Sequence, residues 1–208
     1  MYIGPTEITA LRNILPTQLK SCSTFEIQTA VIWQSWTIAL GLHPNEEVRL
    51  RIFVNSQHIL KNPPLPAGYY GNVIVTPNAL CTVDALIGNL IGYTVELVKA
   101  LNNSVDEEYI KSMVDFLFVN KWPCYTRAHT LTVSDVRRIK HDATDFGWGP
   151  LVHYGPMKGW SGGPRPGHGS FFFSSENSNG ETGILVTMYL PALAMEKFVK
   201  EINGYFGS

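Results

Sequence analysis

A histidine and an aspartate four residues apart, His141 and Asp145, lie in the segment HDATDFGWGP. A histidine nitrogen can take a proton from a hydroxyl when its pKa is near neutral and an acceptor holds its other nitrogen. The pair would therefore suit general-base catalysis on an alcohol. Positions four apart meet on one face of a helix, but the two glycines and the proline that follow Asp145 disfavour a helix. Extended backbone would separate the two residues by roughly 13 Å, so a surface histidine is the favoured interpretation.

The elements that must position such residues begin with a long helix. Ser23 and Glu26 have capping-box spacing and predict a helix to about Leu40, with apolar residues on more than one side. Residues 47–56 (EVRLRIFVNS) alternate apolar and polar positions and predict a strand. Residues 62–72 (NPPLPAGYYGN) contain three prolines and two glycines and predict a long loop. The segment NVIVTP that ends this region is typical of a short buried strand.

Two further helices are predicted in the middle of the chain. Thr82 can cap a helical segment that extends to about Leu101, with Gly88 and Gly92 as weak points. Ser104 and Glu107 have the spacing of a second capping box, which predicts a helix through about residue 118.

The C-terminal part combines a hairpin with a final helix. Asn179 and Gly180 lie between two strand-like segments, which is a strong hairpin signal. Pro191 occupies a plausible first position of a final amphipathic helix. The order of elements predicts an α/β fold in which a mixed sheet is flanked by helices, in one unit of residues 1–208.

Composition excludes several classes of function. The net charge is −1 and no basic segment occurs, so nucleic-acid binding is not expected. The cysteines Cys22, Cys81 and Cys124 form no CxxC pair, so neither a metal site nor a redox pair is predicted, and three idle thiols are expected. The longest apolar stretch is too short for a membrane span, and no charged leader precedes an apolar segment at the N-terminus. A cytoplasmic protein is expected.

The pentapeptide DFGWG at residues 145–149 resembles the signature of the plant BAHD acyl-CoA-dependent acyltransferases. Three more segments resemble this family: TFEIQTAVIWQSWTIAL at 24–40, the loop at 62–72, and GILVTMYLPALAMEKFVKEI at 183–202. The resemblance covers nearly the whole chain. Within the family, the chain is most similar to alcohol acyltransferases, which make esters from alcohols and acyl-CoA.

The resemblance implies a specific place in a larger architecture. Family enzymes have two similar domains with a solvent tunnel between them, in a chloramphenicol acetyltransferase-like architecture of which this chain would be one half. The family's catalytic H-x-x-x-D-G motif belongs to the N-terminal domain. Residues 1–208 are similar to the C-terminal domain alone, so we expect a truncated chain that lacks the catalytic histidine and is inactive by itself. The implied co-substrates are acyl-CoA and a small alcohol, without a tightly bound cofactor or a metal.

The resemblance also implies roles for individual residues. The family's DFGWG aspartate, here Asp145, is structural and pairs with the arginine of a V-N-x-R motif. This chain has Gln57 at that arginine's position, so Gln57, Arg49, Arg51 or another cation is the expected partner of Asp145.

Candidate cofactor-binding residues follow from the same comparison. Ser56, Gln57 and His58 correspond to a region that approaches coenzyme A in the family, and we expect contacts to the nucleotide there. Trp148 is a fourth candidate, which either lines the substrate tunnel or packs in the core.

Two other functions remain open from sequence alone. One is a single-domain acyltransferase that assembles like the chloramphenicol acetyltransferase trimer and uses His141 or His153 as its base. The other is a truncated, non-catalytic module that binds coenzyme A or a full-length relative. A missing partner domain would also leave an apolar face exposed, which predicts association.

Overall fold

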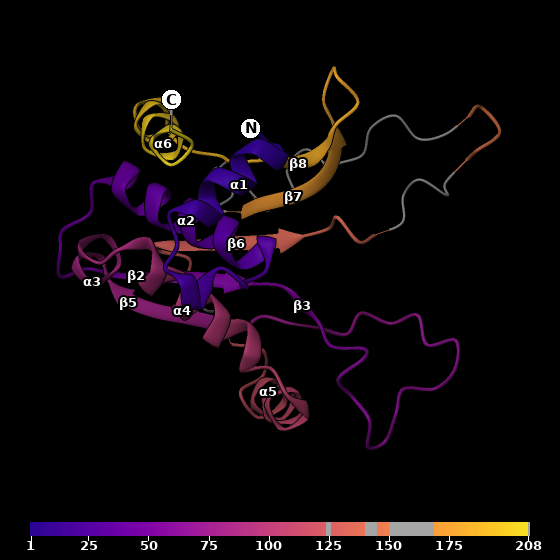
Figure 1. The fold of residues 1–208 in the computed structure, drawn as a ribbon. Coiled ribbons are helices and arrows are strands. Elements are labelled where there is room, and N and C mark those ends of the chain that lie inside the picture. Colours follow the sequence, from indigo (N-terminus) through magenta and orange to yellow (C-terminus); the bar gives the residue numbers. More distant parts are fainter. Residues whose placement is uncertain (124–125, 140–144, 150–168, 208) are drawn as a thin grey trace.

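A computed structural model describes residues 1–123, 126–139, 145–149 and 169–207. A six-stranded sheet forms its centre, with the strands in the order β1–β8–β7–β6–β2–β5 (Figure 1). Strands β2, β6 and β7 run parallel to one another, and the other neighbours pair antiparallel. The strands are β1 (Tyr2–Ile3), β2 (Glu47–Ile52), β5 (Asn78–Thr82), β6 (Thr130–Asp135), β7 (Gly169–Glu176) and β8 (Thr182–Val186). The predicted mixed sheet flanked by helices is confirmed.

The helices differ widely in how deeply they are buried. They are α1 (Pro5–Asn13), the short 3-10 helix η1 (Thr17–Leu19), α2 (Thr24–Leu40), α3 (Val83–Gly88), α4 (Ile91–Asn103), α5 (Glu107–Val119) and α6 (Ala192–Gly204). Across the described residues, no helix combines the length and apolar character that a membrane span requires.

Helix α2 is the central helix of the fold, and thirteen of its 17 residues are buried. The predicted capping box is present, since the Ser23 hydroxyl accepts from the Glu26 N–H and the Glu26 carboxylate accepts from the Ser23 N–H. Gly41 ends the helix in the left-handed conformation that favours glycine (φ 61°). The predicted helix and its burial on several sides are both confirmed.

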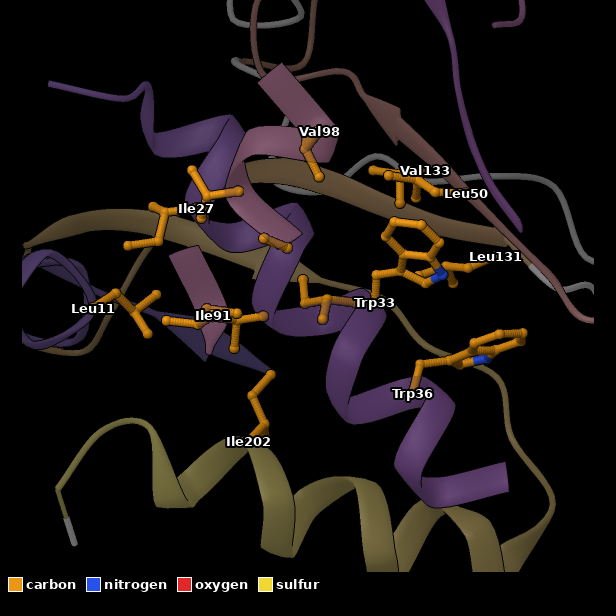
Figure 2. Packing of buried hydrophobic residues seen from close by; sticks show 14 of the residues in the cluster. Leu11, Ile27, Trp33, Trp36, Leu50, Ile91, Val98, Leu131, Val133 and Ile202 are labelled. Atoms are coloured by element: carbon orange, nitrogen blue, oxygen red, sulfur yellow. The ribbon is translucent and has the colours of Figure 1, made fainter. Parts of the chain in front are cut away.

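The main core lies between α2 and the sheet. The Trp33 indole of α2 points toward Leu131, Leu50 and Val133, which come from β6 and β2 (Figure 2). All four side chains are completely buried. A second tryptophan of α2, Trp36, belongs to the same cluster. This packing fixes the parallel strands whose ends carry the candidate site.

The strand predicted over residues 47–56 is broken in two. Strand β2 ends at Ile52, and β3 (Val54–Asn55) pairs with β4 (Ile74–Val75) in a separate two-stranded sheet. The Phe53 N–H still donates to the Val133 carbonyl at 3.1 Å, so the chain leaves the main sheet directly after this bond. The predicted buried strand in NVIVTP is only β4, in which Val75 is buried and Ile74 is exposed.

The single helix predicted from Thr82 to about Leu101 is also divided. The Thr82 cap is confirmed, because its hydroxyl accepts from the Ala85 N–H at 3.2 Å. Helix α3 then ends at Gly88, one of the two predicted weak points, and α4 begins at Ile91, so that Gly92, the other, lies within a helix. The sequence pattern does not predict edge strand β5, which ends at Thr82.

The predicted capping box of Ser104 and Glu107 is wrong, because another residue caps the helix. Asp106, not Ser104, caps α5, and its carboxylate accepts from the Tyr109 N–H at 2.7 Å. Ser104 ends α4 instead, where its hydroxyl donates to the Leu101 carbonyl. The Glu107 carboxylate is therefore directed elsewhere.

The C-terminal predictions are largely confirmed. Strands β7 and β8 form an antiparallel hairpin, with Gly180 in the left-handed region at its turn (φ 77°). Pro191 is the N-cap of α6 rather than its first helical residue. Helix α6 buries Phe198 and Ile202, as an amphipathic helix should.

Candidate functional site

Two segments that carry candidate residues leave the sheet at the same edge. Because β2 and β6 are parallel neighbours, their carboxyl ends lie side by side. The loop of residues 56–72 follows β2 and β3, and the segment 145–149 follows β6. Both extend beyond this edge of the sheet (Figure 1). In open α/β sheets, ligands bind outside the carboxyl ends of parallel strands.

The DFGWG segment is a turn organised by its aspartate. The Asp145 Oδ1 accepts from the Gly147 N–H at 2.7 Å and from the Gly149 N–H at 3.1 Å. Both glycines have positive φ angles, 91° and 106°, which side chains with a β-carbon rarely adopt. The pattern of aspartate and two glycines is thus required by the backbone of this turn.

The expected side-chain partners of Asp145 are engaged elsewhere. Arg49 pairs with Glu47 at 2.9 Å, and the Gln57 side chain accepts from the Asn55 amide at 3.5 Å. Arg51 donates to the Asn78 side chain at 3.0 Å. Within the described ranges, the hydrogen bonds to the Asp145 carboxylate come from its own turn. Asp145 is exposed, so water can solvate its charge without a guanidinium.

The aromatic residues of the turn face solvent. Trp148 is 94% exposed and Phe146 is 77% exposed. Packing of Trp148 in the core of this chain, one of the two expected roles, is therefore wrong. Its role as a residue that lines a tunnel stays a prediction.

The three candidate coenzyme A contacts differ in accessibility. Ser56 is completely buried, and its N–H and hydroxyl both donate to the Val73 carbonyl, at 2.9 and 3.0 Å. A ligand cannot reach this hydroxyl, so Ser56 closes the base of the loop rather than contacting a nucleotide. Gln57 is partly exposed and His58 is exposed, which leaves these two as candidates.

His141 and His153 lie outside the described residues. The proposed pairing of His141 with Asp145 therefore stays a prediction.

Sequence reasoning missed two charged residues that contact the loop, Glu107 and Lys111 of α5. They form a salt bridge of 2.7 Å and both bind the backbone of Asn62. Their spacing of four residues on a helix could have indicated the salt bridge. No sequence signal connects them to a loop 45 residues earlier.

Cys22 and Cys81 are both free thiols. Burial raises the pKa of the Cys81 thiol from its ordinary value near 9 to about 11. At pH 8, below both values, the folded protein should hold about 100-fold less Cys81 thiolate than the unfolded chain, and only the thiolate reacts. We expect iodoacetamide to label Cys81 more slowly in the native protein than in urea, by roughly 10- to 100-fold because the thiolate of higher pKa is also the better nucleophile, as followed by mass spectrometry. Equal labelling rates in the native protein and in urea would contradict burial of the Cys81 thiol. The raised pKa also disfavours Cys81 as a nucleophile.

Comparison with known sequences gives consistent matches over the whole chain. The sequence model of the Transferase family matches residues 12–204. The benzyl alcohol O-benzoyltransferases of Petunia hybrida and Nicotiana tabacum are each 46% identical over 98% of the chain and 44% of their own length. A (Z)-3-hexen-1-ol acetyltransferase of Arabidopsis thaliana is 39% identical over 98% of the chain. The chain thus spans less than half the length of these relatives.

Solved structures share the fold. TRI101 of F. graminearum, complexed with coenzyme A and T-2 mycotoxin, matches 94% of the chain and 46% of that structure, with a TM-score of 0.71 and 15% identity. Vinorine synthase matches 100% of the chain and 48% of that structure, with a TM-score of 0.66 and 15% identity. At this identity the likeness concerns the fold alone, and in each case it extends over about half of the solved protein.

Proposed function

The chain belongs to the Transferase family, the BAHD acyltransferases, and from that premise we propose that it supplies the C-terminal half of an acyl-CoA-dependent alcohol O-acyltransferase. The observation that carries this proposal is the 46% identity to two benzyl alcohol O-benzoyltransferases over 98% of the chain. The 44% share of those relatives' length supports the view that a second half completes the catalytic unit. By the same argument, the acceptor is a small primary alcohol such as benzyl alcohol.

The proposed reaction is acyl transfer between a thioester and an alcohol. A histidine of the other half removes the hydroxyl proton as the alcohol oxygen attacks the thioester carbonyl. The tetrahedral intermediate then expels the coenzyme A sulfur, which takes up the proton, and the ester is released. This chain supplies walls and binding groups for that reaction but not the base.

The described residues support a division of labour between the two segments at the sheet edge. The DFGWG turn, organised by Asp145, presents the exposed Trp148 to the substrate tunnel. The loop that follows Ser56 presents Gln57 and His58 to coenzyme A. In this proposal Asp145 and Ser56 act by shaping the backbone, and neither touches the reacting atoms.

Exposed apolar side chains support association with another protein surface. The C-terminal half of α5 and the turn after it expose several large residues, Val114, Phe116, Phe118, Val119 and Trp122. Phe118 is 81% exposed and Trp122 is 75% exposed. So many large exposed apolar side chains in one short segment are typical of interaction surfaces. We propose that the other half of the enzyme covers these residues, since the chain matches 44% of the length of its benzoyltransferase relatives.

A chimera tests the proposed function directly. The segment of the Petunia hybrida benzoyltransferase that this chain matches would be replaced by residues 1–208, and the native relative would serve as the control. We expect formation of benzyl benzoate from benzoyl-CoA and benzyl alcohol, with release of free thiol. A folded chimera that binds coenzyme A but transfers no acyl group to any small alcohol would overturn the proposal.

The isolated chain distinguishes the two alternatives. We expect it to bind coenzyme A in calorimetry and to release no thiol from acetyl-CoA and an alcohol. Turnover by the isolated chain that is lost in His141→Ala would instead support a self-assembling enzyme, and sizing would then show a trimer. Coenzyme A binding together with an inactive chimera would support the non-catalytic binding module.

A further inference from the structure

The loop of residues 56–72 contains no helix or strand of its own, yet it is held at two points. At its base, the buried Ser56 makes two hydrogen bonds to the Val73 carbonyl. The second point lies at Lys61 and Asn62, about midway in sequence between Ser56 and Tyr69. Beyond it, Tyr70 is 99% exposed. We therefore expect the second point to limit how far the outer part of the loop can move.

The second point consists of three hydrogen bonds to the first turns of α5, together with a salt bridge within that helix. The Glu107 carboxylate accepts from the Lys61 N–H at 3.4 Å and from the Asn62 N–H at 3.2 Å. The Lys111 ammonium donates to the Asn62 carbonyl at 2.9 Å and to the Glu107 carboxylate at 2.7 Å. Both the N–H and the C=O of Asn62 are thus bound by a pair of opposite charges. Charge-assisted hydrogen bonds of this kind are stronger than neutral ones.

Helix α5 is itself fixed to the base of the loop. Ile110 and Val105 pack with Val75 of β4 in a small second core. Partly buried residues from the strand before the loop and from the loop itself join this core, namely Val54, Ile59 and Leu60. The start of the helix that carries the charged pair and the first part of the loop therefore share one small core.

The charges agree with the geometry. The hydrogen bond from Lys111 lowers the pKa of Glu107, against an opposing effect of burial, and the two backbone N–H groups lower it further. The carboxylate is therefore ionised, as acceptance of three hydrogen bonds requires.

We propose that Glu107 and Lys111 are positioning residues, which hold the backbone of Lys61 and Asn62 against α5 and thereby fix the 56–72 loop for the binding of coenzyme A. The role toward coenzyme A rests on the proposed function, whereas the anchoring of the loop does not. A residue 45 or more positions away in sequence thus sets the conformation of the segment that carries Gln57 and His58.

Trypsin provides a direct test of the anchoring, because the Lys61–Asn62 bond is a tryptic site inside the contact. The variants are Glu107→Ala, Glu107→Gln, which keeps an oxygen acceptor, and the control Glu108→Ala, which removes the same charge from the neighbouring exposed position. Cleavage is followed through the fragments 1–61 and 62–208. We expect Glu107→Ala to be cut at least about threefold faster than wild type, Glu107→Gln to be intermediate, and Glu108→Ala to match wild type.

Calorimetry with coenzyme A tests the positioning role in the same proteins and in the chimera. We expect Glu107→Ala to weaken coenzyme A binding severalfold. The midpoint temperature of thermal unfolding should be the same for Glu107→Ala as for Glu108→Ala. Equal cleavage of the two alanine variants would overturn the anchoring. Faster cleavage with unchanged coenzyme A affinity would overturn the positioning role. Absence of coenzyme A binding in wild type would overturn the proposed function and the role toward coenzyme A, and trypsin alone would then decide the anchoring.

Discussion

Replacing Trp33 with alanine should lower the free energy of unfolding by about 3–5 kcal/mol, as measured by urea denaturation followed by circular dichroism. The indole is 0% exposed and lies between α2 and the completely buried residues Leu50, Leu131 and Val133 (Figure 2). Truncation to alanine removes this contact and leaves a cavity. The strands on one side and the fully packed helix on the other cannot fill it. The interior of a protein is packed too densely to relax over such a volume.

Two further substitutions separate packing from other causes. The Trp33 indole N–H is buried without a hydrogen-bond partner among the described residues, so Trp33→Phe, which removes it, should lose far less stability than the alanine variant. Trp122→Ala removes the same side chain from a position that is 75% exposed, and we expect a change within about 0.5 kcal/mol. Similar losses at positions 33 and 122 would contradict the packing described for α2.

The central helix shows what local sequence can predict. Both ends of α2 are fixed within the helix's own neighbourhood, by Ser23 with Glu26 at the start and by Gly41 at the end. Its burial follows from apolar residues on several sides. The hairpin at Gly180 is equally local. Such elements need no information from the rest of the fold.

Elements that depend on distant partners were predicted less well. The strand over residues 47–56 has continuous alternation, but it breaks after Ile52 because Val54 and Asn55 pair with β4 instead of the main sheet. The α5 cap was assigned to Ser104 because S-V-D-E has capping-box spacing. Asp106, two residues closer to the helix, is an equally good cap and prevails.

The candidate site likewise combines features that local sequence predicts with features that depend on distant contacts. The two glycines of DFGWG could be read as turn residues, and the turn requires their positive φ angles. Burial of Ser56 and exposure of Trp148 could not be read from the sequence, because each depends on how a loop packs. The contact from Glu107 to the 56–72 loop joins two elements that share no sequence pattern. In general, a contact between a charged side chain and the backbone of a distant segment can be recognised only when the fold is known.

Replacing Gln34 with leucine should destabilise the protein by about 2–4 kcal/mol, because the change leaves several polar groups without a partner. The Gln34 amide is buried and donates to the Leu86 carbonyl at 2.7 Å and to the Asn89 carbonyl at 3.2 Å, where α3 ends. It also accepts from the Tyr205 hydroxyl at the end of α6. One side chain thus joins α2 to two other parts of the helical layer, and leucine of similar size can replace none of these bonds.

A double-mutant cycle with Tyr205→Phe isolates the third bond. Tyr205→Phe alone removes one donor and should lower the free energy of unfolding by about 1 kcal/mol, since the Gln34 amide keeps its two carbonyl partners. In the double variant the phenylalanine no longer leaves a hydroxyl to be satisfied, so the loss should be smaller than the sum of the single losses by roughly 1 kcal/mol. Strict additivity in urea denaturation would show that Gln34 and Tyr205 do not interact in solution. In that case the losses at Gln34 would have to come from the α3 carbonyls alone, because those bonds do not involve α6.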